Sequence, residues 1–221
     1  IVRFLPSLNP REFGAVAIGG EVVRPGRYEI RKGDKLSDLL QRVGGLTPFA
    51  YPYGAVFVRE SVRQAEQVGF DRAAREIQAG LARAAQDLAA NELAAVQQVI
   101  GQLRSTPAMG RVVVEADPTV LRVRPELDVL LEPGDRIVYP KRPPYIVVSG
   151  AVLNPTALQF EAGQDVRHYL DQAGGFQRFA DRRRTFIVFP NGAASRADLG
   201  VFEYSVRRPP PGTTIVVPPD P

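Results

Sequence analysis

The chain has 221 residues and a mass of 24.2 kDa, with 44% hydrophobic and 24% charged residues, a composition typical of globular proteins. It has no cysteine and a single histidine, which excludes disulfides, thiolate metal sites and cysteine nucleophiles. The net charge of +4 comes from 28 basic and 24 acidic residues spread along the chain, with no basic stripe carrying interleaved aromatic residues. We therefore expect no nucleic-acid partner.

Residues 1–13 fit none of the elements described below, and we expect them to be the tail of an upstream segment of a longer protein. No apolar run approaches the ~18 residues of a membrane-spanning helix. The sequence therefore predicts no membrane segment in this chain.

A first folding unit is predicted over residues 14–140. Residues 15–23 are apolar and β-branched and predict a strand, followed by a turn at Pro25 and a short return strand over residues 28–30. A short helix comes next, because apolar residues follow with the spacing i, i+3, i+4, i+7. These residues are Leu36, Leu39, Leu40 and Val43.

The glycine pair Gly44-Gly45 stands where this helix needs a left-handed C-terminal cap, so we expect positive φ there. Further strands are predicted over residues 55–59 and within Pro133 to Pro140, which reads PGDRIVYP. Strand, turn, strand, short helix and further strands predict an α+β unit.

Between these last strands lies an insertion, residues 61–110, rich in Ala, Gln, Glu and Arg. Its apolar residues form two helical faces whose phase slips near Asn91, which predicts two antiparallel helices with a turn at 89–92; one continuous helix is the alternative. The two faces are either internal to the hairpin or a surface that packs against a partner. The candidate partner-packing residues are Leu81, Leu88, Val96 and Leu103.

The second unit, residues 145–221, repeats the first and follows a stiff linker, residues 141–144, that reads KRPP. Gly20 aligns with Gly150 at an offset of 130 residues, and the last strand repeats at an offset of 78 because the second copy lacks the insertion. Its predicted helix has the matching apolar residues Val166, Tyr169, Leu170 and Ala173, and ends at Gly174-Gly175. We expect equivalent cores in which Leu40 matches Leu170 and Phe49 matches Phe179, all four buried.

The stretch GGEVVRPGRYEIRKGDKLSDLLQRVGGLTPFA resembles the soluble-ligand-binding β-grasp (SLBB) domain, and the resemblance extends from Val16 to Pro218. The second copy departs from the pattern at Thr156 and at Thr213, which replaces the aspartate of Pro-Gly-Asp. Tandem copies are characteristic of outer-membrane polysaccharide export proteins. The fold implied is two tandem β-grasp (SLBB) domains, the first with an inserted α-helical hairpin.

The resemblance implies a structural and assembly module on the periplasmic side of the Gram-negative outer membrane, which helps to form an oligomeric conduit for capsule or exopolysaccharide. The expected partners are further copies of the full-length protein, the polysaccharide and an inner-membrane co-polymerase or transporter. The alternative is a monomeric β-grasp module that binds a carbohydrate or small ligand.

An enzyme, for example one that modifies polysaccharide, is the third class, and the sequence argues against it. His168 aligns with Asp38 on the polar face of the short helix, and no nucleophile, metal or nucleotide motif is present. We expect no catalytic residue, metal or cofactor. The densest positive cluster, Arg182, Arg183 and Arg184, is either a solvated loop or a contact for an acidic glycan, because arginine forks fit carboxylates and phosphates.

Overall fold

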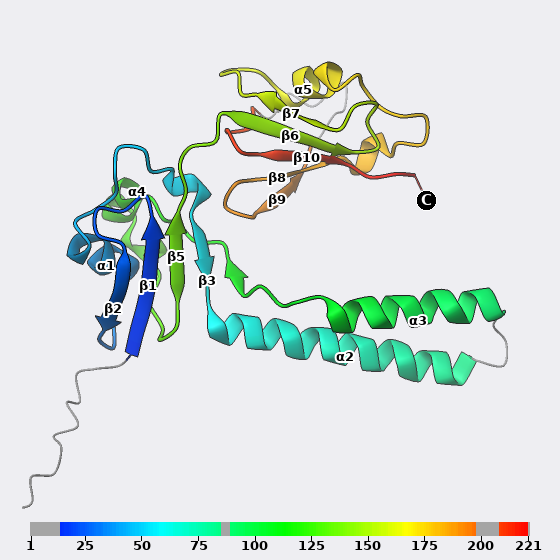
Figure 1. The fold of residues 1–221 in the computed structure, drawn as a ribbon, viewed down its shortest axis with the longest axis horizontal. Helices are drawn as coiled ribbons and strands as arrows, with labels where there is room; N and C mark the ends of the chain where they lie inside the picture. Colours follow the sequence, from blue (N-terminus) through cyan, green and yellow to red (C-terminus); the bar gives the residue numbers. More distant parts are fainter. Residues whose placement is uncertain (1–13, 85–88, 198–207, 221) are drawn as a thin grey trace, which may run out of the picture. The chain divides into compact units, whose positions relative to one another are not determined.

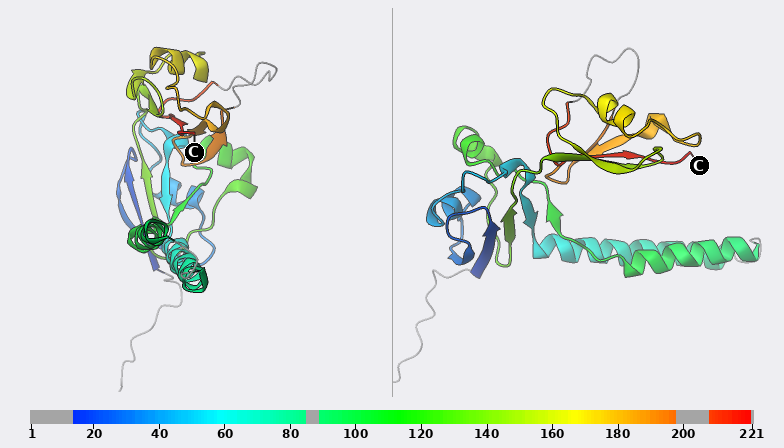
Figure 2. Two further views of the ribbon diagram at one scale, coloured as in Figure 1. Left: turned by 90° about the vertical axis from the view of Figure 1, so that its right-hand side faces the viewer. Right: turned by 45° about the horizontal axis from the view of Figure 1, so that its top comes forward.

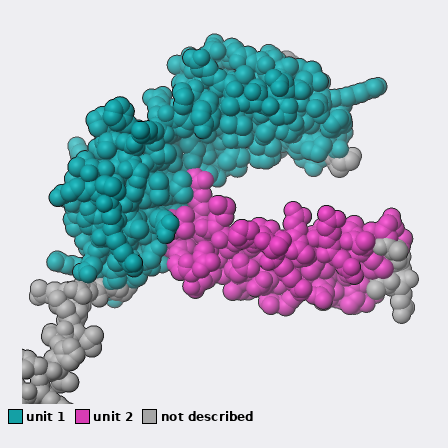
Figure 3. All heavy atoms as spheres, in the orientation of Figure 1, with its two compact units in different colours: residues 1–57, 113–221 teal, residues 58–112 magenta. Residues whose placement is uncertain are grey.

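A computed structural model describes residues 14–84, 89–197 and 208–220. The described residues form two five-stranded sheets, each accompanied by short helices, and a helical hairpin (Figure 1). The described residues of 58–112, which contain the hairpin, form one compact unit, and the other described residues form the second (Figure 3).

The first sheet has the order β2-β1-β5-β3-β4. β1 pairs antiparallel with β2 and parallel with β5. The strands are β1 (Gly14–Gly20), β2 (Gly26–Ile30), β3 (Val56–Val58), β4 (Arg111–Val112) and β5 (Arg136–Tyr139). The accompanying helices are α1 (Leu36–Arg42), η1 (Pro52–Gly54), α4 (Pro118–Val123) and η2 (Pro125–Leu127).

The second sheet has the same arrangement, in the order β7-β6-β10-β8-β9. Its strands are β6 (Tyr145–Gly150), β7 (Thr156–Gln159), β8 (Phe186–Val188), β9 (Ala194–Arg196) and β10 (Thr214–Val217), and its helices are α5 (Val166–Gln172) and η3 (Arg182–Arg184). Ala17 pairs with Arg136 in the first sheet, and Val147 pairs with Thr214 in the second. These registers reproduce both offsets seen in the sequence, so the α+β fold with two equivalent modules is confirmed.

In each module the short helix covers one face of the sheet, which Figure 2 shows for α5. All eight residues of the predicted apolar faces are buried, including Leu40 and Leu170 at 3% and 2% exposure. Both glycine pairs have the expected left-handed backbone, with φ between 82° and 88°. The helix and its cap were therefore predicted correctly in both copies.

The expectation that Phe49 and Phe179 are buried is wrong, because they are 69% and 58% exposed. Each is a central residue of a β-turn, closed by the N–H of Ala50 donating to Thr47 O (3.1 Å) and that of Ala180 donating to Gln177 O (3.2 Å). Central turn residues project away from the chain that they reverse. The repeat at these positions therefore preserves an exposed ring in both modules.

The insertion forms two helices, α2 (Glu60–Ala84) and α3 (Ala90–Ser105), which lie side by side in both views of Figure 2. Arg104 Nη2 donates to Gln78 Oε1 across them (2.7 Å). The antiparallel pair is thus confirmed over the single long helix. Residues 90–92, which the sequence assigned to the turn, already belong to α3, and Glu92 Oε2 accepts the N–H of Ala89 (2.9 Å) and so caps the start of that helix.

The hairpin occupies the position of a tight turn in the other module. In the second module the N–H of Phe189 donates to Ala193 O (2.8 Å) and closes the Asn191-Gly192 turn between β8 and β9. In the first module the N–H of Arg59 donates to Gly110 O (2.8 Å) at the base of the two helices. The β-hairpin is therefore common to both modules, and only the length of its connection differs.

Candidate functional site

The arginine cluster forms the short helix η3, which Asp181 holds in place. Asp181 Oδ1 accepts the backbone N–H groups of Arg183 and Arg184, both at 3.0 Å. This arrangement satisfies two backbone donors that the first turn of a helix leaves unpaired. All three arginine side chains are exposed.

Two of the three guanidinium groups already have partners within the module. Arg184 forms an ion pair with Asp181, and its side-chain hydrogen bond lowers the pKa of that carboxyl. Arg182 lies over the ring of Phe176, with Cζ 5.0 Å from the ring centroid. The cluster therefore presents less free positive charge than three consecutive arginines suggest, and its contact with glycan remains a prediction.

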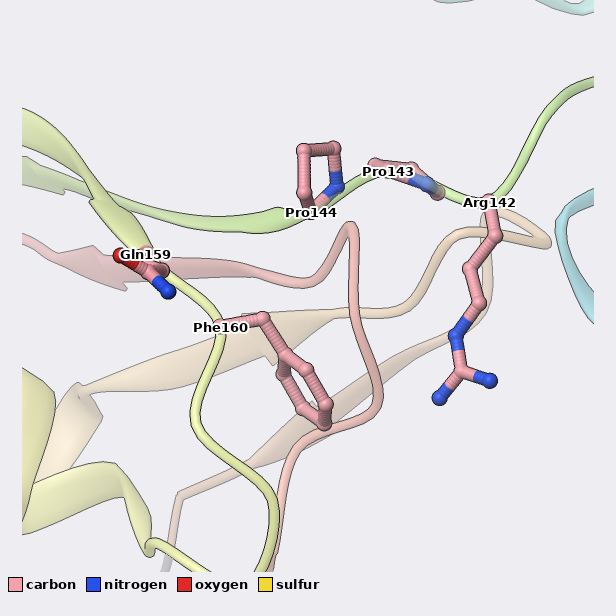
Figure 4. A pocket seen from close by; sticks show the side chains of 5 residues that line it. All are labelled: Arg142, Pro143, Pro144, Gln159 and Phe160. Atoms are coloured by element: carbon pink, nitrogen blue, oxygen red, sulfur yellow. The ribbon is translucent and has the colours of Figure 1, made fainter.

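A pocket of about 570 Å³ lies beside the linker, at the end of β7 (Figure 4). Figure 4 shows Arg142 and Phe160 extending toward the same space, with the rings of Pro143 and Pro144 along its side. The Arg142 Cζ atom is 5.9 Å from the centroid of the Phe160 ring. Gln159 completes the lining. This pocket offers a cation, an amide and three apolar rings.

The local sequence builds this pocket from two segments. The N–H of Phe160 donates to Pro144 O (2.8 Å), which ties the end of β7 to the linker. Pro143 packs against Gly212, where an added Cβ would lie 2.7 Å from Pro143 Cγ. Sequence reasoning missed Arg142 as a site residue because it treated KRPP only as a linker. The sequence feature that could have indicated the site is an arginine followed by two prolines directly before a strand.

A second pocket, of about 540 Å³, lies between α1 and α4 in the first module. Leu40 and Leu121 line it, and the exposed Arg122 and Gln41 contribute polar groups. Asp128 in its wall is engaged in the fold, because its carboxylate accepts the Ser37 hydroxyl (2.6 Å) and the Ser37 N–H (3.2 Å). Apolar and polar side chains thus line this pocket together.

In the hairpin, Leu81, Val96 and Leu103 are half-buried, and Leu88 lies outside the described residues. Leu81 also lines a depression together with Ile100. Whether this face meets a partner remains a prediction. Among the described residues no group of three or more His, Asp or Glu side chains is placed to hold a metal ion, and no helix is both long and apolar enough to cross a membrane.

The single histidine is half-buried on α5. His168 Nε2 lies 3.4 Å from Glu161 Oε2 and 2.9 Å from Gln172 Nε2, and the ring meets Tyr169 edge-on. These neighbours are a carboxylate, an amide and a tyrosine ring. His168 therefore takes part in polar contacts with neighbouring side chains at the surface of the second domain.

Comparison with protein families identifies the domain type of the two modules. Residues 15–65 and 145–193 both match the family model described as the SLBB domain. The chain contains two tandem SLBB domains. This confirms the resemblance inferred from the sequence, and it assigns the arginine cluster to the second SLBB domain and most of the hairpin to the region between the two matches.

Among similar curated proteins, the Polysialic acid transport protein KpsD of Escherichia coli is 32% identical over 91 residues, which cover 41% of this chain and 16% of that protein. A second protein of the same name is 31% identical over the same length. The Uncharacterized protein YjbG of E. coli strain K12 is 26% identical over 155 residues, 69% of this chain and 63% of that protein. The chain therefore matches less than two thirds of the length of these relatives.

Proposed function

We propose that this chain is a non-catalytic structural and assembly part of a bacterial polysaccharide export protein. The observation that carries the proposal is the pair of SLBB domains in identical register, in a chain similar to a polysialic acid transport protein. We place it on the periplasmic side of the outer membrane, where copies of the full-length protein form a conduit for capsule or exopolysaccharide. An inner-membrane co-polymerase or transporter is the further partner proposed.

The hairpin is the proposed assembly element. It projects from a connection that the second SLBB domain closes with a tight turn, so the sheet does not need it. The proposed partner-packing residues are Leu81, Leu88, Val96 and Leu103. Half-buried leucine and valine side chains, such as Leu81, Val96 and Leu103, can lose their remaining exposure against a neighbouring copy.

The test replaces residues 60–109 of the full-length protein with Pro-Asn-Gly, the connection of the second domain. Cross-linking in cells should then show loss of the higher oligomers, and surface polysaccharide should fall with it. A matched control replaces the exposed Gln64 and Arg72 with alanine within an intact hairpin. Unchanged oligomers after the replacement would contradict the role given to the hairpin.

The second candidate function is a monomeric module that binds a carbohydrate or small ligand, and the two described pockets favour it. Light scattering on the full-length protein separates the two functions. A stable monomer at micromolar concentration supports the binding module and contradicts the conduit.

A further inference from the structure

We propose that the pocket beside the linker binds one carboxylate-bearing sugar residue of the polysaccharide, with the Arg142 guanidinium on the carboxylate. This inference rests on the proposed function, because it names the class of glycan that the exporter handles. The lining residues are Arg142, Pro143, Pro144, Gln159 and Phe160.

Arg142 carries the selectivity for an acidic sugar. Its side chain is exposed, and among the described residues no carboxylate forms an ion pair with it. The neighbouring Lys141, in contrast, forms an ion pair with Glu21, with Nζ 3.7 Å from Oε1. A guanidinium has five N–H donors in a planar fork, which matches the two oxygens of a carboxylate. The Arg142 guanidinium lies over the Phe160 ring, and its N–H fork therefore offers a bidentate site that no carboxylate of the described residues occupies.

The apolar rings supply the other half of a sugar site. A pyranose ring has a hydroxyl-rich edge and a face of C–H groups, and such a face packs on flat apolar surfaces. Phe160, Pro143 and Pro144 provide three rings around the space into which Arg142 extends (Figure 4). The Gln159 amide can donate to and accept from hydroxyl groups. At about 570 Å³, the pocket lies within the usual range for small ligands.

The pocket is formed before any ligand arrives. The prolines fix two φ angles of the linker, and the Phe160 N–H bond to Pro144 O fixes the opposite wall. Phe160 also packs against the core of the second domain. Groups that are already ordered lose little conformational entropy on binding, so even a single sugar residue can be retained.

The site is specific to the second domain. Gln159 and Phe160 correspond to Glu29 and Ile30 in the first domain, where a carboxylate replaces the amide and a buried aliphatic residue replaces the ring. A negative charge at that position repels an acidic sugar. We therefore expect one such site in this chain rather than two.

The experiment titrates the 221-residue chain with trigalacturonic acid, using isothermal titration calorimetry and NMR. Maltotriose serves as the neutral probe and inorganic phosphate as the non-sugar anion. We expect saturable binding of trigalacturonic acid, with a shift of the Arg142 Nε–H signal, and at least tenfold weaker binding of the other two probes. Equal binding of maltotriose, or phosphate that competes at the same concentration, would overturn the proposal.

Arg142→Gln should weaken the binding of trigalacturonic acid about tenfold or more, because a hydrogen-bonded charged pair contributes about 1.5–3 kcal/mol. Arg178→Gln is the matched control, since it removes the same charge from another exposed arginine of the second domain that belongs neither to this pocket nor to the arginine cluster. It should change the affinity less than about twofold. Equal losses in the two variants would show general charge attraction and overturn the site. Phe160→Leu, which keeps an apolar residue against the core, should also weaken binding.

Cross-linking separates this proposal from the proposed function. The full-length Arg142→Gln protein should still form the higher oligomers, since the pocket is not the assembly element. Binding that is lost in this variant while oligomers persist supports both proposals. A wild-type protein that binds trigalacturonic acid but never oligomerises would contradict the conduit and leave the pocket supported. A wild-type protein that oligomerises but does not bind trigalacturonic acid would contradict the pocket and leave the conduit supported.

Discussion

At the scale of single residues, the repeat keeps glycine where two strands come too close for a side chain. Gly20 has φ +77°, and an added Cβ would lie 2.1 Å from Tyr139 O. Gly150 has the same relation to Val217 O, at 2.0 Å. Glycine recurs at these two positions because β1 pairs in parallel with β5, and β6 pairs in parallel with β10, at this close approach.

Gly20→Ala should lower the free energy of unfolding by more than about 2 kcal/mol, because it combines left-handed backbone strain with a clash against backbone atoms. Gly19→Ala is the control: no atom beyond Gly19 and its two chain neighbours lies within 4 Å of the added Cβ, and φ at Gly19 is not positive. It should cost less than about 1 kcal/mol in urea unfolding. Similar costs for the two variants would show that the close approach does not matter.

The turn before the last strand is held by different chemistry in the two domains. Asp135 is buried, and its carboxylate accepts the N–H of Glu132 (2.8 Å). Thr213 stands in its place in the second domain, and its hydroxyl donates to Pro210 O (2.6 Å). Proline has no N–H, so an aspartate there would lose this donor. The departure of the second copy from Pro-Gly-Asp therefore follows from Pro210.

Thr213→Asp should destabilise the protein by at least about 2 kcal/mol, because it buries a carboxylate without that backbone donor. Thr213→Ser keeps the hydroxyl and should cost less than about 1 kcal/mol. Thermal and urea unfolding of both variants provide the measurement. An aspartate variant as stable as the serine variant would contradict this account of the turn.

At the scale of elements, the two short helices begin with different caps. In α5, Asp165 Oδ1 accepts the N–H of His168 (2.9 Å) from the position directly before the helix. In α1 that position is Lys35, whose N–H donates to Asp38 Oδ2 (2.9 Å), and Asp128 adds a carboxylate from far along the chain that accepts the Ser37 N–H. The contacts of Asp165 and Asp38 are local and could be read from the sequence. The contact of Asp128 could not, because only the fold brings residue 128 to residue 37.

The hairpin should be dispensable for folding. With residues 60–109 replaced by Pro-Asn-Gly, the hydrogen bond between Arg59 and Gly110 can still form, because the second domain closes the same bond with a tight turn. Circular dichroism should show a loss of helical signal with retention of cooperative unfolding. A chain that no longer unfolds cooperatively would mean that the hairpin completes the core.

At the scale of the whole molecule, the second domain has a core of its own. Its cluster of buried residues runs from Ile146 to Val217 and includes Leu170, the counterpart of Leu40 in the first domain. Each sheet is likewise built only from strands of its own domain. We therefore expect the stability of the two domains to be separable.

Leu170→Ala should cost about 2–5 kcal/mol, because it leaves a cavity in the second core. Hydrogen exchange should then speed up in peptides from residues 145–197, with little change in residues 14–57. Leu40→Ala is the reciprocal variant and should reverse the pattern. If either variant increased exchange equally in both domains, the two would form one cooperative unit.

The sequence by itself determined the repeat, the strand and helix of each unit, the glycine caps and the two helices of the insertion. These features depend on local preferences, such as apolar spacing, turn residues and backbone freedom. All of them except the insertion occur in both copies of the repeat. Even the buried face of each short helix followed from spacing alone, because four apolar residues on one side of a helix have only the sheet to cover them.

The tertiary structure alone decided which exposed side chains share a site. Phe49 and Phe179 repeat like core residues but lie in turns, and the charges of Arg182 and Arg184 are engaged by Phe176 and Asp181. Arg142, from a segment that reads only as a linker, meets Phe160 at the end of β7. Burial and pairing depend on contacts between segments distant in the sequence, and local preferences do not encode those contacts.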